Sequence, residues 1–208
     1  MRTVIIGVIL ALAGASLGAQ TLGNGLILIL AGPPGSGKTT QAEYIKKEFR
    51  IPFVSAATAL KQARGWMKTS KESRAAMAGG AMLSDEGTSE LMIEYIKRQD
   101  FKRGFVLDGY PATKGQAQAL EQFAKELALL PPVVILLEVP DEVVRQRMAD
   151  RKRADDTPAN IEARIKEYHE ESTALLAAYP AVRLMRVDAT KPPSEVYKQI
   201  KSLLKAGN

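Results

Sequence analysis

A glycine-rich run at residues 32–39 carries the clearest chemistry in the sequence. It reads GPPGSGKT and fits the spacing G-x-x-x-x-G-K-[ST]. The glycines allow the backbone to turn so that successive N–H groups point at phosphate oxygens. A helix that starts here would add the positive end of its dipole. The pattern predicts a binding site for nucleotide phosphates. The lysine would supply a mobile positive charge, and a threonine would offer its hydroxyl to magnesium or to a phosphate. The residues of this predicted site are Gly35, Ser36, Gly37, Lys38, Thr39 and Thr40.

Asp108 is a second candidate, because it ends the apolar run GFVLD at residues 104–108. Proteins that bind nucleotides through such a loop hold Mg²⁺, directly or through water, with an aspartate opposite the loop. Asp-Gly is also a common turn pair, so the phosphate loop is what gives Asp108 its functional meaning. We expect Asp108 and Thr39 to be the residues nearest to magnesium.

Four arginines form a third group. Arg147 and Arg151 are four residues apart and share one face of a predicted helix. Arg153 follows, and Arg164 lies on the next predicted helix. Phosphoryl transfer places negative charge on the moving group, which planar and permanently charged guanidinium groups stabilise. A solvated basic surface is the alternative for any single arginine, but the group together favours catalysis, with the neighbouring Asp155 and Asp156 orienting or pairing with the guanidinium groups.

Five apolar runs and the helical patterns between them would position these residues. The runs are residues 26–30, 53–55, 105–107, 133–137 and 182–187, and the helical patterns cover residues 39–49, 85–97, 115–130, 141–151, 158–179 and 194–205. Strands that alternate with helices predict an α/β fold, a five-stranded parallel sheet with helices on both faces. Ligands bind at the carboxyl ends of the strands in such folds, and each motif above follows a strand.

Composition limits the alternatives. No cysteine is present, so disulfides and thiolate metal sites are excluded, and a single histidine argues against a histidine-rich metal site. The net charge of +6 suits an anionic partner. Phosphate sites account for this charge, and the five Phe, six Tyr and one Trp form no stacking platform, so we expect no nucleic-acid binding.

The first twenty residues differ from the rest. An arginine precedes an apolar stretch and then a run of small residues, which is the order of a secretory signal peptide. We expect a leader at residues 1–20, with an uncleaved anchor or a mis-assigned start codon as alternatives, and one domain at residues 21–208. The leader suggests export.

Several motifs in order resemble the adenylate kinase family of nucleoside monophosphate kinases. They are GPPGSGKTT at residues 32–40, GFVLDGYP at 104–111 followed by Gln116, RADDTP at 153–158, IKEYH at 165–169 and VDATKP at 187–192. The resemblance implies a P-loop NTP hydrolase fold with a small helical acceptor-binding insertion at about residues 55–83 and a short lid at about 151–157. It also implies a cytoplasmic monomer, in conflict with the leader.

The resemblance further implies a role for each site residue. The phosphate loop would hold ATP with Arg147 and Arg151 over its phosphates, and the segment that ends at Lys191 would lie against the adenine. Arg153 and Arg164 would reach the transferred group. Magnesium would accompany ATP. The residues expected to bind the acceptor monophosphate are Arg153, Arg164, Lys61, Ala81, Met82, Leu83, Gly109 and Gln116.

The acceptor side departs from the family pattern. Ala112 stands where the family usually has an arginine that binds the acceptor phosphate, Ala56 replaces a hydroxyl residue, and Lys61 replaces another arginine. Each lost charged hydrogen bond costs about 1.5–3 kcal/mol, roughly ten- to a hundred-fold in binding or rate. The sequence therefore predicts Mg-ATP-dependent phosphorylation of a nucleoside monophosphate, most simply AMP. The alternatives are an ATP-binding relative with weak or lost transferase activity and a kinase of another small acceptor.

Overall fold

The computed structural model describes residues 25–63, 83–151 and 153–206, and the predicted leader lies outside these ranges. Five strands form one sheet in the order β2-β3-β1-β4-β5, and all neighbouring strands pair in parallel. The strands are β1 (Leu26–Ala31), β2 (Phe53–Ser55), β3 (Gly104–Asp108), β4 (Val133–Glu138) and β5 (Leu184–Asp188). This confirms the predicted α/β class and the five-stranded parallel sheet.

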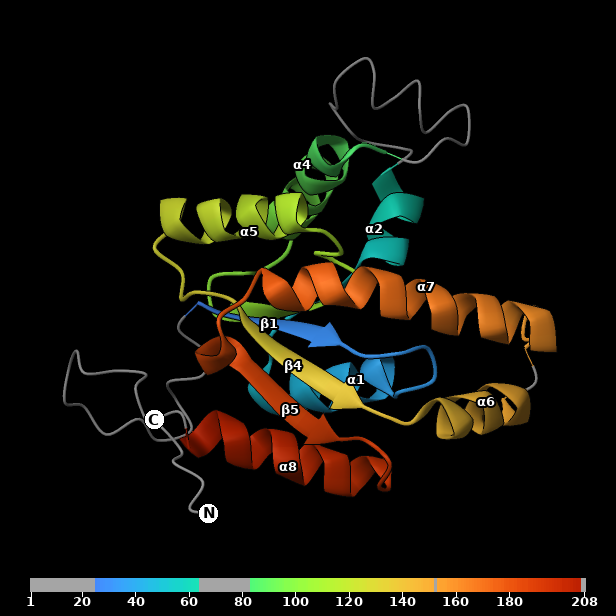
Figure 1. The fold of residues 1–208 in the computed structure, drawn as a ribbon. Coiled ribbons are helices and arrows are strands. Elements are labelled where there is room, and N and C mark those ends of the chain that lie inside the picture. Colours follow the sequence, from blue (N-terminus) through green and yellow to red (C-terminus); the bar gives the residue numbers. More distant parts are fainter. Residues whose placement is uncertain (1–24, 64–82, 152, 207–208) are drawn as a thin grey trace.

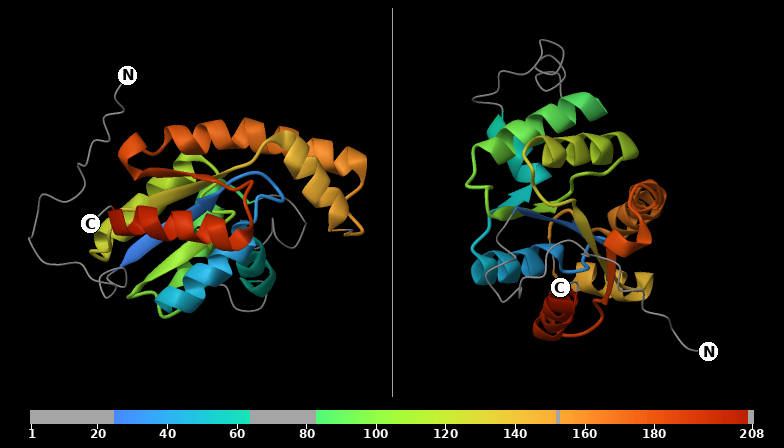
Figure 2. Two further views of the ribbon diagram at one scale, coloured as in Figure 1. Left: turned by 90° about the horizontal axis from the view of Figure 1, so that it is seen from below. Right: turned by 90° about the vertical axis from the view of Figure 1, so that its left-hand side faces the viewer.

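Helices cover both faces of the sheet (Figures 1 and 2). On one face lie α1 (Lys38–Phe49) and α8 (Pro193–Ala206), and on the other α4 (Asp85–Lys97), α5 (Lys114–Glu126) and α7 (Pro158–Ala177). The short helices α2 (Ala56–Ala63) and α6 (Asp141–Asp150) follow β2 and β4 directly, and a 3-10 turn, η2 (Ala181–Arg183), precedes β5.

Strand β1 shows why the sheet strands read as unbroken apolar runs. Its alternate residues pack in two separate cores: Ile27 and Ile29 face α4, α5 and α7, whereas Leu28 and Leu30 face α1 and α8. A strand covered on both faces has no solvent side, so polar alternation disappears. A third small core joins α6 to α7 and consists of Val144, Met148, Ile161 and Ile165.

Two predicted boundaries are wrong because of a local turn, and the helix predicted at residues 158–179 ends at Ala177. The helix predicted at residues 115–130 ends at Glu126, because Ala128 adopts φ 52° and the Leu129 N–H bonds back to the Ala124 carbonyl at 2.9 Å. The strand predicted to begin at residue 182 begins at Leu184, because Arg183 N–H bonds to the Pro180 carbonyl in the 3-10 turn. Both errors arise where a local turn interrupts an apolar pattern.

The predicted acceptor insertion is described only in part. Helix α2 and residue Leu83 belong to it, while residues 64–82 lie outside the described ranges. The predicted lid is the connection between α6 and α7, of which residues 151 and 153–157 are described. Among the helices that the structure describes, none combines the length and apolar character needed to cross a membrane.

Candidate active site

The loop between β1 and α1 forms the predicted phosphate cradle. Gly32 has φ 146°, and a Cβ at this position would lie 2.7 Å from the Leu137 carbonyl oxygen, so only glycine fits. Gly37 has φ 94° and precedes α1 without any side-chain cap. The amino end of α1 is therefore left with the open backbone N–H groups that bind anions. Thr39 and Thr40 are exposed in its first turn.

Lys38 is folded back onto this loop. Its Nζ donates to the Gly32 carbonyl at 2.7 Å and to the Pro33 carbonyl at 3.0 Å. Burial lowers the pKa of Lys38, the negative charge of Asp108 opposes that shift, and the positive charge of Arg151 adds to it. The ammonium group therefore lies within electrostatic reach of both residues and is held in the loop by neutral carbonyls.

Asp108 ends β3 beside the phosphate loop. The sheet register places it next to Leu30 of β1 on one side and Ser55 of β2 on the other. Burial raises the pKa of Asp108, and Lys38 opposes the shift. A partly buried carboxylate that is destabilised by desolvation gains most from a nearby cation.

The oxygen donors at this edge fit magnesium. The Asp108 carboxylate and the Thr39 hydroxyl are hard ligands of the kind that Mg²⁺ prefers. Within the described ranges, no three His, Cys, Asp or Glu side chains gather into a metal site. The oxygens of Asp108 and Thr39 are thus the groups at this edge whose chemistry suits magnesium.

Two of the predicted arginines converge on one carboxylate. Arg151 donates to Asp156 through Nε and through Nη2, the latter at 2.7 Å to Oδ1, and Arg164 donates to the same Oδ1 at 3.0 Å. Arg164 also pairs with Asp155. The Asp156 side chain is only 1% exposed. Hydrogen bonding from Arg151 lowers the pKa of Asp156, and hydrogen bonding from Arg164 lowers that of Asp155.

Arg147 and Arg153 take different positions. Arg147 Nη2 donates to the Thr190 carbonyl at 3.1 Å and so connects α6 with the segment that follows β5. A Cβ added to Gly35 would lie 3.7 Å from the Arg147 Cβ, which places this residue against the phosphate loop. Arg153 is exposed and its charge acts on Asp156.

The segment predicted to contact the donor base is shaped by Asp188. Its Oδ1 accepts from the Thr190 N–H at 3.0 Å and from the Thr190 hydroxyl at 2.6 Å. Lys191 follows and is exposed. With Arg147 bound to Thr190, this segment and the phosphate loop lie on the same side of α6.

The predicted acceptor residues are brought together only in part. A Cβ at Gly109 would lie 3.4 Å from the Ala56 Cβ, so the start of α2 adjoins the Asp-Gly motif. Lys61 is exposed on α2, and Leu83 is half-buried before α4. Ala81 and Met82 lie outside the described residues. Gln116 is 7% exposed, and its amide bonds to other parts of the protein, as described below.

One cavity connects the two sides of the site. It has a volume of about 120 Å³ and is bordered by Lys38 and Gly32 of the phosphate loop and by Gly109 and Ala112 of the Asp-Gly motif. Tyr168 of α7 also lines it. The cavity is thus where a group could pass between a molecule on the phosphate loop and a molecule beside Ala112.

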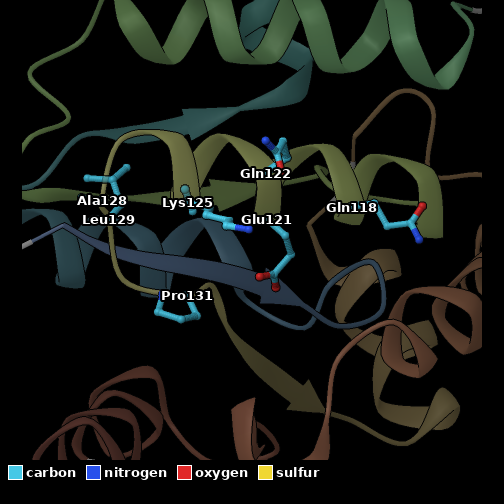
Figure 3. Close-up of a pocket in the computed structure, with 8 residues that line it drawn as sticks. Gln118, Glu121, Gln122, Lys125, Ala128, Leu129 and Pro131 are labelled. Atoms are coloured by element: carbon cyan, nitrogen blue, oxygen red, sulfur yellow. The ribbon is translucent and has the colours of Figure 1, made fainter. Parts of the chain in front are cut away.

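A larger hollow of about 570 Å³ lies elsewhere (Figure 3). Gln118, Glu121, Gln122 and Lys125 of α5 border it together with Pro131, which precedes β4. This is the edge where the parallel strands begin, opposite to the edge of the phosphate loop. The larger hollow therefore lies away from the sequence motifs, and the smaller cavity lies between them.

Asp85, Tyr168 and Ser172 were not predicted to be near the site. Asp85 contacts Gln116, and the other two line the 120 Å³ cavity. Asp85 opens α4, where an acidic residue is ordinary, and the other two lie within a long amphipathic helix. Tyr168 belongs to the IKEYH motif, which gave it no role at the site, and no local pattern distinguishes Asp85 or Ser172, because their partners are distant in the chain.

Comparison with known proteins agrees with the geometry. The sequence model of a family described as "Adenylate kinase" matches residues 30–183. A Cyanothece adenylate kinase is 35% identical over 183 residues, which cover 85% of this chain and 94% of the relative. Adenylate kinases of a Chelativorans species and of Bartonella henselae are 35% and 33% identical, over 97% and 99% of their own lengths.

Proposed function

Because this chain belongs to the adenylate kinase family and is a nucleoside monophosphate kinase, we propose that it transfers the γ-phosphoryl group of Mg-ATP to AMP and releases two ADP. An oxygen of the acceptor phosphate attacks the γ-phosphorus as the bond to the β–γ bridging oxygen breaks. The choice of adenine as the acceptor base and of magnesium as the metal belongs to this proposal.

The 120 Å³ cavity is the observation that supports this reaction best. It is bordered by the donor lysine, Lys38, and by the Gly109–Ala112 segment of the acceptor motif. Phosphoryl transfer requires the two phosphates to lie in line and in contact. One cavity bordered by both motifs supports such a placement.

On the donor side, the phosphate loop would hold the ATP phosphates with its backbone N–H groups and Lys38. Arg147 and Arg151 would neutralise charge on the same phosphates, and the segment that ends at Lys191 would lie against the adenine. Arg153 and Arg164 would reach the moving group and the acceptor phosphate. The pairing of Arg164 with Asp155 and Asp156 keeps that guanidinium group ordered near the site before nucleotide binds.

Magnesium would be held by the ATP phosphates with Thr39 and Asp108, directly or through water, and would neutralise charge on the transferring group. Closure of the lid at residues 151–157 and of the insertion at 55–83 would exclude water, which is the competing acceptor. We also infer a monomer, since the chain alone supplies every residue named for the reaction.

The test is turnover of the purified protein with Mg-ATP and each of AMP, CMP, UMP, GMP and their deoxy forms. Chromatography would follow the diphosphates. We expect ADP from AMP, and with Lys38→Ala a rate that is lower by about 10²–10³-fold. Binding of ATP without a phosphorylated acceptor would contradict the proposal.

A second candidate is an ATP-binding relative with slow transfer. It is favoured by Ala112, whose methyl group borders the cavity where the family usually places a guanidinium group. The same panel distinguishes the two, because turnover of a monophosphate at an enzyme-like rate supports the kinase, whereas ATP binding with only slow diphosphate formation supports the second candidate.

A further inference from the structure

The edge of the sheet where the parallel strands begin carries exposed cations, far from the phosphate loop. Five of them, which we call the basic edge, are Arg50, Lys102, Arg103, Lys125 and Lys205. Within the described ranges, none of the five forms an ion pair with another residue. Their charge is therefore available to a partner outside the protein.

The strand register and the helix directions bring these residues to one side. Gly104 pairs with Leu26, so the residues that precede β3 adjoin the start of β1. Helices α1, α5 and α8 each run back from the carboxyl ends of the strands. Arg50, Lys125 and Lys205, at or next to the ends of these helices, thus lie on the side where the strands begin (Figure 1).

Helix dipoles explain only part of this charge. A cation in the last turn of a helix stabilises that helix, which accounts for Lys125 and Lys205. Lys102 and Arg103 lie in the connection between α4 and β3, where no helix ends beside them in sequence. These two cations therefore need another explanation.

Acidic residues on the same side oppose the charge only in part. Glu48 pairs with Lys201 there. Asp100 and Glu126 are exposed, and Glu126 accepts a hydrogen bond from Gln122 at 2.8 Å. The five cations of the basic edge still outnumber these two exposed carboxylates, so the side keeps an excess of positive charge.

Two leucines are exposed among these cations. Leu127 and Leu130 are 40% and 41% exposed, on either side of the turn at Ala128. The Leu130 N–H donates to the Gly25 carbonyl at 3.1 Å, so the turn adjoins the entry to β1. A hollow of about 470 Å³ is bordered by Gly25, by Lys102 and by the turn itself. One exposed leucine is ordinary in a globular protein, but a pair beside an apolar hollow and a ring of cations suits an amphipathic partner.

The sequence before Gly25 indicates what that partner is. Residues 3–20 contain no charged side chain and are mostly apolar, a composition that favours a lipid bilayer over water. Only residues 21–24 separate this stretch from Gly25. Because an extended chain spans at most about 3.6 Å per residue, a bilayer that holds residues 3–20 would lie within about 20 Å of the basic edge.

We propose that the basic edge docks on an anionic lipid bilayer, beside the point where residues 3–20 enter it. The cations attract anionic headgroups, and the two leucines insert at the boundary between headgroups and acyl chains. A nucleic acid would use the cations but neither the leucines nor the apolar stretch. The phosphate loop lies at the opposite edge of the sheet, so the nucleotide site would face away from the membrane and stay open to its substrates.

Hydrogen exchange of the full wild-type chain tests this orientation. The chain is compared alone, with vesicles of phosphatidylglycerol mixed with phosphatidylcholine, and with vesicles of phosphatidylcholine only. We expect the anionic vesicles to slow exchange at residues 102–103 and 127–130. Exchange at residues 35–39 of the phosphate loop should stay unchanged.

The charges are tested by sedimentation with the same vesicles, using the double variant Lys102→Gln and Arg103→Gln. Its partition coefficient onto anionic vesicles should fall on the order of tenfold, and that onto neutral vesicles should stay the same. The matched control is Lys166→Gln with Lys198→Gln, which removes two exposed cations from α7 and α8 outside the basic edge. The control should change the partition far less.

The leucines are tested in the same way with Leu127→Gln and Leu130→Gln together. This variant should bind both kinds of vesicle several-fold more weakly, because the inserted apolar surface is lost. Leu60→Gln is the control, since Leu60 is equally exposed, at 40%, on α2. It should leave the partition unchanged.

The proposal is overturned if the wild type partitions equally onto anionic and neutral vesicles, or if the charge variant behaves like its control. Slowed exchange at the phosphate loop instead of the basic edge would also overturn it. Protection of the same loops by duplex DNA but not by vesicles would assign the edge to nucleic acid. Should a variant lose its cooperative melting transition, the exchange pattern of the wild type decides alone.

Discussion

The donor and acceptor sides of the cavity are built from the same sheet edge but differ in charge. The donor side has Lys38 in the phosphate loop, with Arg147 on α6 and Arg151 directly after this helix. The acceptor side presents Ala112 at the cavity, and Lys61 is exposed on α2. Among the described residues, the donor side therefore has more positive charge beside the cavity, and we expect ATP to be held by more charged contacts than the acceptor phosphate.

The two sides also differ in how their polar groups are ordered. On the donor side Asp156 holds two guanidinium groups that would serve the phosphates. On the acceptor side Asp85 holds the amide of Gln116. A carboxylate contacts the polar group in each case, but the guanidinium groups are charged and the Gln116 amide is neutral.

The largest expected effect is on the donor side, with Lys38→Ala. Removing one preorganised donor to the phosphates should lower kcat by about 10²–10³-fold. Lys46→Ala is the control, because Lys46 is exposed on the same helix and pairs with Glu43 at the surface. Steady-state transfer with AMP measures both. Equal losses in the two variants would show that α1 stability, not the ammonium group, was affected.

Next in size is a gain on the acceptor side, from Ala112→Arg. A restored charged hydrogen bond to the acceptor phosphate should raise kcat/KM for AMP about ten- to a hundred-fold. Ala112→Met fills the same cavity without charge and should give no such gain. If methionine improves the rate as much as arginine, then packing rather than charge limits the acceptor side.

A smaller effect is expected from Asp156→Asn, which removes the shared partner of Arg151 and Arg164. Because the pKa of Asp156 is lowered in the folded protein, its ionised form stabilises the fold. That contribution is complete above the unfolded-state pKa, about 3.9, and is lost as the pH falls through the folded-state value.

The melting temperature of Asp156→Asn should therefore lie below that of the wild type at neutral pH, and the gap should close as the pH falls below about 4. Asp155→Asn is the comparison, and its gap should be smaller because that side chain is 59% exposed. A difference in melting temperature that persists at low pH would mean that the ionised form of Asp156 does not stabilise the fold.

The smallest effect concerns two helix caps. Thr113 accepts from the Gln116 N–H at 3.2 Å and donates to Asp85, whereas Thr157 accepts from the Asn160 N–H at 3.3 Å. Thr157→Val should lower the free energy of unfolding by about 1 kcal/mol, and Thr113→Val should lower it by about 1–2 kcal/mol. Urea unfolding measures both. A larger loss of unfolding free energy in Thr157→Val than in Thr113→Val would contradict this expectation.

Much of the fold could be predicted, because buried parallel strands leave unbroken apolar runs. All five runs correspond to strands of the sheet. The end of α5 could not be predicted, because residues 127–130 are LALL and their polarity gives no sign that Ala128 turns into the left-handed region. The start of β5 was missed for a similar reason, since one turn after Pro180 interrupts the apolar run.

The candidate site was predictable where function needs a contiguous motif, as in the phosphate loop. The contact between Asp85 and Gln116 joins residues far apart in the chain, and nothing in the residues around Asp85 points to it. The contacts of Asp155 and Asp156 were predictable in part. The sequence suggested that these residues pair with arginines, but not that Asp156 binds Arg151 and Arg164 together.

The contrast between the two sides is tested most directly by two-substrate kinetics of the wild-type protein, with Mg-ATP varied at saturating AMP and AMP varied at saturating Mg-ATP. We predict two ADP per turnover, with ATP saturating at a clearly lower concentration than AMP. Absence of ADP at every concentration, or AMP saturating at least as readily as ATP, would contradict a nucleoside monophosphate kinase with a complete donor side and a weakened acceptor side.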